Sequence, residues 1–173
     1  MAGVVGLEDG WRDDAAFDPR DDVMMKSVLL AAAVALVAGS AVAQDASRDP
    51  VFGTMNLTAG FDNGAPEQRR VRAGGPNDAS HLPGICSGNV GTGPDFRINY
   101  TAGNRELIFR SVSGADTTLV INGPDGRWYC DDDSFGDLDA EYRFVNPRSG
   151  TYLVWLGVVR MREADTTFVV SER

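Results

Sequence analysis

The stretch DTTLVINGPDGRWYC, residues 116–130, decides the fold class. It opens with an apolar, β-branched run at 117–121, which is typical of a strand buried in the middle of a sheet. The tetrapeptide GPDG at 123–126 follows, where proline presets φ and glycine accepts a positive φ. A second short run, 127–130, comes directly after this turn. The stretch therefore predicts two strands joined by a tight β-hairpin turn.

Similar segments flank this hairpin on both sides. Apolar and polar residues alternate with a period of two around Val71 and over 96–101, 106–111 and 141–144, which indicates half-buried strands. Residues 151–159 and 166–170 are more continuously apolar and suit central strands. We therefore expect an all-β protein, a compact β-sandwich or jelly roll of about eight or nine strands.

The N-terminal part predicts export. The apolar run VLLAAAVALVA at 28–38 follows Lys26 and precedes the small residues at 41–43, a pattern typical of a secretory signal peptide cleaved before Gln44. The run is shorter than the roughly 20 residues that cross a bilayer, so we expect no transmembrane segment in the mature chain. We predict a periplasmic or secreted protein.

Residues 1–24 are acidic where a signal peptide should begin with positive charge. We interpret them as an upstream extension that is not native, with translation starting at Met24 or Met25. The expected organisation is an extension at 1–24, a signal peptide at 25–43, a short linker at 44–50 and the β-sandwich domain at 51–173.

Charge and cysteine content narrow the function further. The chain carries 16 basic and 25 acidic side chains, a formal net charge of −9, which excludes a nucleic-acid reader because that needs a basic face. Cys86 and Cys130 are its only cysteines, and in an oxidising compartment they predict one disulfide. Two free buried thiols are the alternative. The Gly- and Asn-rich segment 73–95, which contains Cys86, is expected to be a long loop with little regular structure.

A family resemblance rests on residues 115–157. An Asp-led apolar strand, a P-D-G hairpin, an acidic loop and a closing S-G-x-Y strand occur there in the order of the bacterial pre-peptidase C-terminal domain, which this stretch resembles. With CSGNVGTGPD at 86–95 and SGTYLVWLG at 149–157, the chain also looks like small exported bacterial proteins often labelled as trypsin-like serine peptidases. The match covers nearly all of 51–160.

This resemblance implies a β-sandwich that accompanies secreted enzymes or stands alone, and that binds calcium in some relatives. It implies no catalytic residue here, because the G-D-S-G-G and A-A-H-C segments of trypsin-like peptidases do not occur in this sequence.

An acidic segment follows the hairpin and is a candidate calcium site. Calcium takes about six to eight oxygen ligands, and carboxylates crowded on one loop repel one another unless a cation or water neutralises them. An EF-hand frame starting at Asp131 fails, because Phe135 and Tyr142 occupy ligand positions. A merely solvated loop is the alternative reading. The candidate ligands are Asp116, Asp131, Asp132, Asp133, Asp137 and Asp139.

Two other groups of residues are candidates for catalysis or for carbohydrate binding. Ser80 and His81 leave a serine–histidine–carboxylate triad open, but no nucleophile elbow accompanies them, so we interpret His81 as a surface residue. Four aromatic residues offer stacking surfaces for carbohydrate, although at strand spacing they are better explained as core residues. These are Trp128, Tyr129, Tyr152 and Trp155.

The resulting hypothesis is an exported, non-catalytic binding or accessory module, stabilised by calcium (Ca²⁺), with a protein, peptide or glycan partner at the cell envelope. A secreted serine peptidase and a carbohydrate-binding module are the alternatives.

Overall fold

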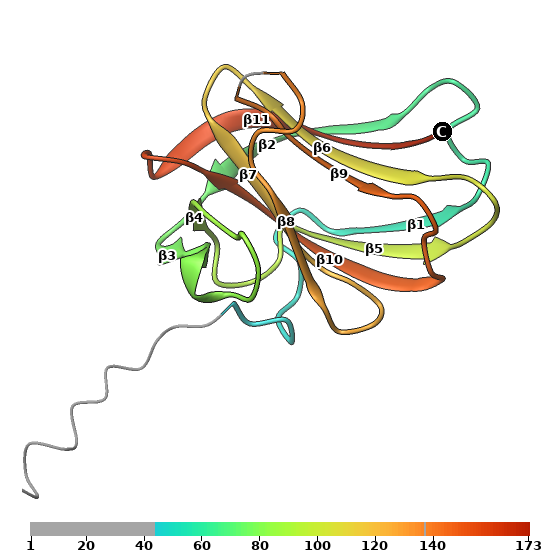
Figure 1. The fold of residues 1–173 in the computed structure, drawn as a ribbon, viewed down its shortest axis with the longest axis horizontal. Coiled ribbons are helices and arrows are strands. Elements are labelled where there is room, and N and C mark those ends of the chain that lie inside the picture. Colours follow the sequence, from blue (N-terminus) through green and yellow to red (C-terminus); the bar gives the residue numbers. More distant parts are fainter. Residues whose placement is uncertain (1–43, 137) are drawn as a thin grey trace, which may run out of the picture. The chain divides into compact units, whose positions relative to one another are not determined.

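The computed structural model describes residues 44–136 and 138–173. The extension, signal peptide and start sites predicted at 1–43 lie outside these residues. In the described part, eleven strands form two open sheets, and the only helix is a single 3₁₀ turn at Ala79–His81. The two sheets form separate layers that face each other in Figure 1. The predicted all-β sandwich is therefore confirmed. No helix in the described residues is both long enough and apolar enough to cross a membrane.

The first sheet is built around β10 (Gly150–Val158). On one side β10 pairs with β5 (Phe96–Thr101) and, at its far end, with β4 (Asn89–Val90); on the other side it pairs with β7 (Thr117–Asn122). The edge strand β1 runs parallel to β5. The seven strands of this sheet are β1 (Thr54–Thr58), β3 (Asn77–Asp78), β4 (Asn89–Val90), β5 (Phe96–Thr101), β7 (Thr117–Asn122), β8 (Trp128–Asp131) and β10 (Gly150–Val158).

The second sheet has four antiparallel strands in the order β2-β11-β6-β9. Its long central strand β11 pairs with β2 on one side and with β6 on the other. The strands are β2 (Glu67–Gly74), β6 (Leu107–Ser113), β9 (Ala140–Phe144) and β11 (Glu163–Glu172).

The main core lies between the sheets. Along β5, Phe96, Ile98 and Tyr100 are at most 2% exposed, as their alternation with polar residues predicts. The ring of Phe96 stacks on that of Phe168 from β11, with centroids 4.9 Å apart. Contacts of this kind join the two layers and bury most of the large apolar side chains.

The predicted hairpin joins β7 and β8. Gly126 has φ of 74°, a conformation that glycine adopts without strain, and its N–H donates to the carbonyl of Gly123 at 2.9 Å. The Gly123 N–H in turn donates to the Arg127 carbonyl at 2.9 Å. The turn therefore forms where the sequence predicts it.

A second, smaller core lies on the outer face of the first sheet. Side chains alternate along β10, so Tyr152 and Val154 point into the sandwich while Leu153 and Trp155 point outward. Residues 75–90, which we call the lid, cover this outward side and pack Ala79, Leu82, Cys86 and Val90 against Leu153 and Trp155. The lid contains β3, β4 and the 3₁₀ turn, so it is more regular than the sequence predicts and raises the strand count above nine.

The residues preceding β1 contact the segment after the lid and the smaller core. The backbone N–H of Asp45 donates to the Thr92 carbonyl and that of Val51 to the Pro94 carbonyl, at 2.8 and 2.9 Å. Ala46 packs against the smaller core. The segment predicted as a linker, 44–50, therefore lies along residues 92–95.

Candidate functional site

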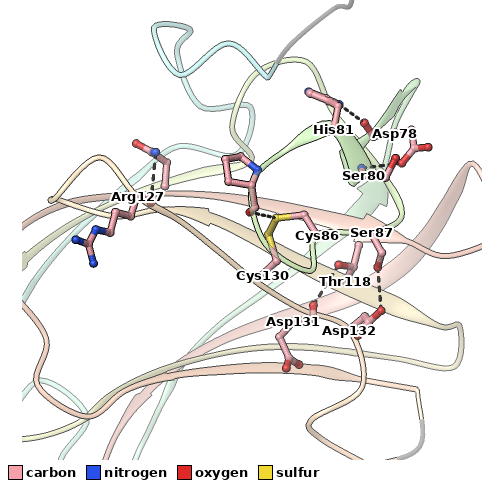
Figure 2. The surroundings of a disulfide bond; sticks show 12 residues. Asp78, Ser80, His81, Cys86, Ser87, Thr118, Arg127, Cys130, Asp131 and Asp132 are labelled. Carbon is pink, nitrogen blue, oxygen red and sulfur yellow. Dashed lines mark hydrogen bonds between the residues drawn. A yellow bond between two sulfur atoms is a disulfide. The ribbon is translucent and has the colours of Figure 1, made fainter.

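The lid is fixed to the sheet by a covalent bond. Cys86 and Cys130 form the predicted disulfide, with their Cα atoms 5.0 Å apart, and it joins the lid to β8 (Figure 2). Next to it, the Ser87 hydroxyl donates to the Asp132 carboxylate at 2.9 Å, while within the lid the Ala79 N–H donates to the Gly88 carbonyl at 2.9 Å. The lid is therefore held by covalent and polar bonds as well as by apolar packing.

One part of the lid remains exposed beside a shallow apolar groove. Ile85, the residue before Cys86, is 76% exposed, the largest fraction among the large exposed apolar side chains. Pro83 and Gly84 of the lid line the groove together with Gly126, Arg127 and Trp128 of the hairpin. The Trp128 ring is half-buried and lies 5.3 Å from that of Trp155, measured between centroids. The lid and the hairpin thus present an apolar surface that is anchored at the disulfide.

The acidic loop, residues 131–139, begins one residue after Cys130. Its carboxylates already accept hydrogen bonds: Asp131 from the Ser134 and Glu141 N–H groups at 3.1 and 2.8 Å, and Asp139 from the Ser113 N–H at 2.9 Å. The Ser134 hydroxyl also donates to Asp131. These bonds hold the first and last residues of the loop and occupy part of the oxygen atoms that a cation would use.

The remaining predicted calcium ligands differ in what the structure shows of them. Loss of hydration, and then the charges of Asp132, Asp116 and Asp131, raise the pKa of the Asp133 carboxyl, so these three acids lie close enough to Asp133 to disfavour its charge. Asp137 lies outside the described residues. Among the residues that are described, no three acidic, histidine or cysteine side chains are arranged to hold a metal ion. Calcium binding at this loop stays a prediction.

Ser80 and His81 lie side by side in the 3₁₀ turn and do not face each other across a cleft (Figure 2). The Ser80 N–H donates to the Asp78 carboxylate at 2.9 Å, which caps the turn. His81 is exposed, and its Nδ1 lies 2.7 Å from the backbone carbonyl of Asp78 rather than from a carboxylate. In a catalytic triad the carboxylate would instead orient the imidazole toward the serine hydroxyl.

Two of the four aromatic residues that are candidates for carbohydrate binding are buried, and the other two are partly buried. Trp155 and Tyr152 are at most 1% exposed, and Tyr152 shares edge contacts with Phe109 and Phe144 in the main core. Tyr129 donates its hydroxyl to Asp125 at 2.7 Å and packs beside Phe144. These rings belong to the two cores, and only Trp128 borders the surface groove.

Two buried carboxylates are features that sequence analysis missed. Asp95, directly before β5, is 5% exposed and accepts the Leu156 N–H at 2.6 Å; burial raises the pKa of its carboxyl to about 7 against this hydrogen bond. Asp62, in the loop after β1, is 7% exposed. Both follow a turn-forming or apolar residue in the sequence, and no pattern distinguishes them from surface aspartates.

These observations define the class of protein: a β-sandwich in which a disulfide-anchored lid covers one outer face and carries an exposed apolar residue. No family model and no curated protein matches the chain. Among solved structures, the chain is similar to PliG from Aeromonas hydrophila, a periplasmic lysozyme inhibitor of g-type lysozyme, with 14% identity and a TM-score of 0.40. That comparison covers 73% of this chain and 100% of PliG.

Proposed function

We propose that the protein is an exported, non-catalytic binding module that contacts a protein partner through the lid and the adjoining groove. The observation that carries this proposal is Ile85, which is 76% exposed on a segment anchored by a disulfide. A branched apolar side chain gains free energy when a partner removes it from water. The Gly- and Pro-lined groove beside it offers a neighbouring contact surface.

The anchoring of the lid supports this proposal on energetic grounds. Binding costs free energy for each segment that becomes ordered, and a segment ordered beforehand avoids that cost. The disulfide at Cys86, the Ser87–Asp132 hydrogen bond and the packing of Leu82 against the sheet all act on the lid before any partner arrives. Ile85 is therefore presented in a defined position.

The acidic loop favours a partner with positive charge. Asp131, Asp132 and Asp133 follow Cys130 directly, so the loop begins at the disulfide that also anchors Ile85. In the described part of the chain none of these three carboxylates forms an ion pair with an arginine or histidine. Such a surface attracts cationic partners and speeds their association, most strongly at low salt.

The geometry around Ser80 and His81 supports a non-catalytic role. Neither side chain lies in the pairing that a nucleophilic serine requires. The resemblance to pre-peptidase C-terminal domains supports the same reading, since those domains accompany enzymes. We expect the purified protein to leave casein uncleaved, and cleavage that disappears in His81→Ala would overturn the non-catalytic part of the proposal.

Calcium at the acidic loop is a separate part of this proposal. A cation shared by Asp132, Asp133 and Asp116 would relieve the repulsion that raises the pKa of the Asp133 carboxyl. Calcium should then raise the melting temperature by several degrees at about hundredfold excess over Kd, and magnesium should do less. Asp131→Asn/Asp133→Asn should remove this effect. An equal rise with sodium at matched ionic strength would leave only screening of the loop charges.

The binding surface can be tested by site-specific photo-crosslinking in the cell envelope. A photoreactive residue at position 85 should give a discrete crosslinked partner, whereas the same residue at Arg70, exposed on the other sheet, should not. The partner, once identified and purified, should bind Ile85→Asp at least about tenfold more weakly than the parent, as expected for a residue near the centre of an interface. Equal affinity of Ile85→Asp and parent, or identical crosslinks from positions 85 and 70, would refute the proposed surface.

A further inference from the structure

The outer edge of β1 is a feature that the proposed function leaves unused. β1 lies at the end of the first sheet and, in the described part of the chain, pairs only with β5. The Ala59 N–H donates to the Thr101 carbonyl of β5 at 2.8 Å, so the odd-numbered residues of this segment direct their backbone groups to β5. The backbone groups of the even-numbered residues therefore point away from β5 along an open edge. These residues are Thr54, Asn56 and Thr58.

This edge lacks the devices that usually keep a strand from pairing with another chain. Natural proteins place charged residues, proline or a bulge on exposed edge strands, or keep those strands very short. The other edge strands of the described sheets all carry charge: β2 has three arginines and a glutamate, β9 has an arginine and a glutamate, and β3 and β8 each end at an aspartate. β1, with the sequence TMNLT, carries none. Its edge can therefore accept a further strand without burying a charge.

The sequence of β1 is complementary to itself about Asn56. If two β1 strands pair in antiparallel register centred on this residue, Asn56 faces Asn56 of the second copy, Thr54 faces Thr58, and Met55 faces Leu57. Hydroxyl groups then meet hydroxyl groups, and apolar side chains meet apolar side chains. The even-numbered residues form the hydrogen-bonded pairs of this ladder, which matches the outward direction of their backbone groups. The Thr58 carbonyl already accepts the Phe61 N–H at 3.0 Å, and its second lone pair remains for the ladder.

A row of side-chain hydrogen bonds also ends at this edge. The Thr151 hydroxyl on β10 donates to Asn99 Oδ1 on β5 at 3.0 Å, and Asn99 Nδ2 donates to Asn56 Oδ1 at 2.8 Å. Asn56 Nδ2 donates to no other group of the described residues. In the antiparallel register it can donate to the Asn56 amide oxygen of the second copy, which has a second lone pair. The row would then continue across the two-fold axis.

Two exposed apolar residues extend the edge at the start of β1. Val51 is 67% exposed and Phe52 is 40% exposed. Their N–H groups donate to the Pro94 and Asp95 carbonyls at 2.9 and 2.8 Å, so this segment runs beside the residues that precede β5. The antiparallel register places it next to residues 60–61 of the second copy. Contact there would remove apolar surface from water on both copies.

We propose that the edge of β1 joins two copies of this chain into a symmetric dimer, with the two β1 strands antiparallel about Asn56. The two seven-stranded sheets then form one continuous sheet related by a two-fold axis, the commonest symmetry of protein dimers. The pairing is narrow compared with a standard interface of about 1,600 Å², so the dimer dissociates on dilution. It uses no residue of the lid, so the dimer presents two copies of the proposed binding surface.

Sedimentation velocity of the purified protein over a concentration series tests the pairing. The parent should shift from monomer toward dimer as its concentration rises. Thr54→Lys/Thr58→Lys places like charges opposite each other at both ends of the strand pair and should raise the dissociation constant at least about tenfold. Thr54→Glu/Thr58→Lys places opposite charges at the same positions and should keep the dimer. Thr151→Lys, at an exposed residue two strands from the edge, is the control and should behave as the parent.

Cysteine crosslinking tests the register. Opposed residues of a hydrogen-bonded antiparallel pair have Cα atoms about 5.5 Å apart, within the range of about 4.4–6.8 Å that a disulfide spans. Under mild oxidation Asn56→Cys should therefore form a disulfide-linked dimer much faster than Thr151→Cys. The proposal is overturned if the parent stays monomeric at every concentration, or if Thr54→Lys/Thr58→Lys dimerises as strongly as the parent. Equal crosslinking rates of the two cysteine variants would overturn it as well.

Discussion

Asp95→Asn should make the protein more stable at pH 8 and remove a distinct part of its pH dependence. Asp95 is 5% exposed, and burial raises the pKa of its carboxyl from 3.8 to about 7 although the Leu156 N–H donates to it. The folded state therefore holds a proton that the unfolded state releases between these two values. Folding is favoured by this group below the unfolded pKa, and that advantage is lost as the pH rises to about 7.

The magnitude follows from the difference between the two pKa values. Each pKa unit corresponds to about 1.4 kcal/mol, so ionised Asp95 destabilises the fold by up to ~4 kcal/mol above the folded pKa. Asparagine keeps a carbonyl oxygen for the Leu156 N–H and cannot ionise. The variant should match the parent near pH 4 and exceed its free energy of unfolding by a few kcal/mol at pH 8.

Urea denaturation at several pH values measures this difference directly. Other carboxylates titrate over the same range, but they are common to both proteins, so the variant-minus-parent difference isolates Asp95. Asp49→Asn, at a fully exposed side chain, serves as the control and should give a difference near zero at every pH. A difference for Asp95→Asn that stays flat from pH 4 to pH 8, or that favours the parent at pH 8, would refute the reasoning.

Three further predictions concern stability. The double variant Cys86→Ala/Cys130→Ala removes a crosslink between residues 44 apart and should lower the free energy of unfolding, measured in urea, by about 4 kcal/mol. Its Trp155 fluorescence should shift to the red as the lid loosens, and unchanged emission would contradict the covering role of the lid. Burial alone would raise the pKa of Glu141, but hydrogen bonds from Arg143 and Arg110 hold this pKa below its usual value. Glu141→Gln should therefore lower the free energy of unfolding by about 1–3 kcal/mol at pH 7. That cost should vanish as acid protonates Glu141, and a cost independent of pH would exclude this account. Gly157→Ala would place a Cβ against Thr118 Cγ2 of β7 and 2.7 Å from Val90 Cγ1 of the lid, and it should destabilise by about 1–3 kcal/mol. Gly126→Asn at the open hairpin turn should be nearly neutral, and equal costs would contradict the close packing around Gly157.

The strands were predictable wherever one face is buried and the other is wet. Phe96, Ile98 and Tyr100 alternate with polar residues because only one side of β5 enters the core. β1 was not predicted as a separate strand, although Met55 and Leu57 alternate with Asn56 and Thr58 in the same way. The continuous apolar run of β10 correctly indicated a central strand. Which of its two buried faces meets the lid could not be derived, because both faces consist of similar residues.

The candidate sites were harder to predict than the strands. The disulfide followed from counting cysteines, but the exposure of Ile85 depends on how residues 75–90 pack over the sheet. Local acid density drew attention to Asp131–133, where hydrogen bonds to Ser134 and Glu141 already engage one carboxylate. Asp62 is buried where it accepts the backbone N–H of Glu172, 110 residues further along the chain, and only tertiary folding brings the two together. Charge patterns along the chain cannot report the burial of such a carboxylate.

The division of apolar contacts into two cores gives the protein two levels of cooperativity. The smaller core depends on the lid, which is joined to the sheet through one crosslink and two-residue strands, whereas the larger core is enclosed by whole sheets. In native-state hydrogen exchange, lid amides such as that of Ala79 should therefore exchange through a local opening, while those of β10 and β11 require global unfolding. The lid can thus open locally while the sandwich beneath it stays folded.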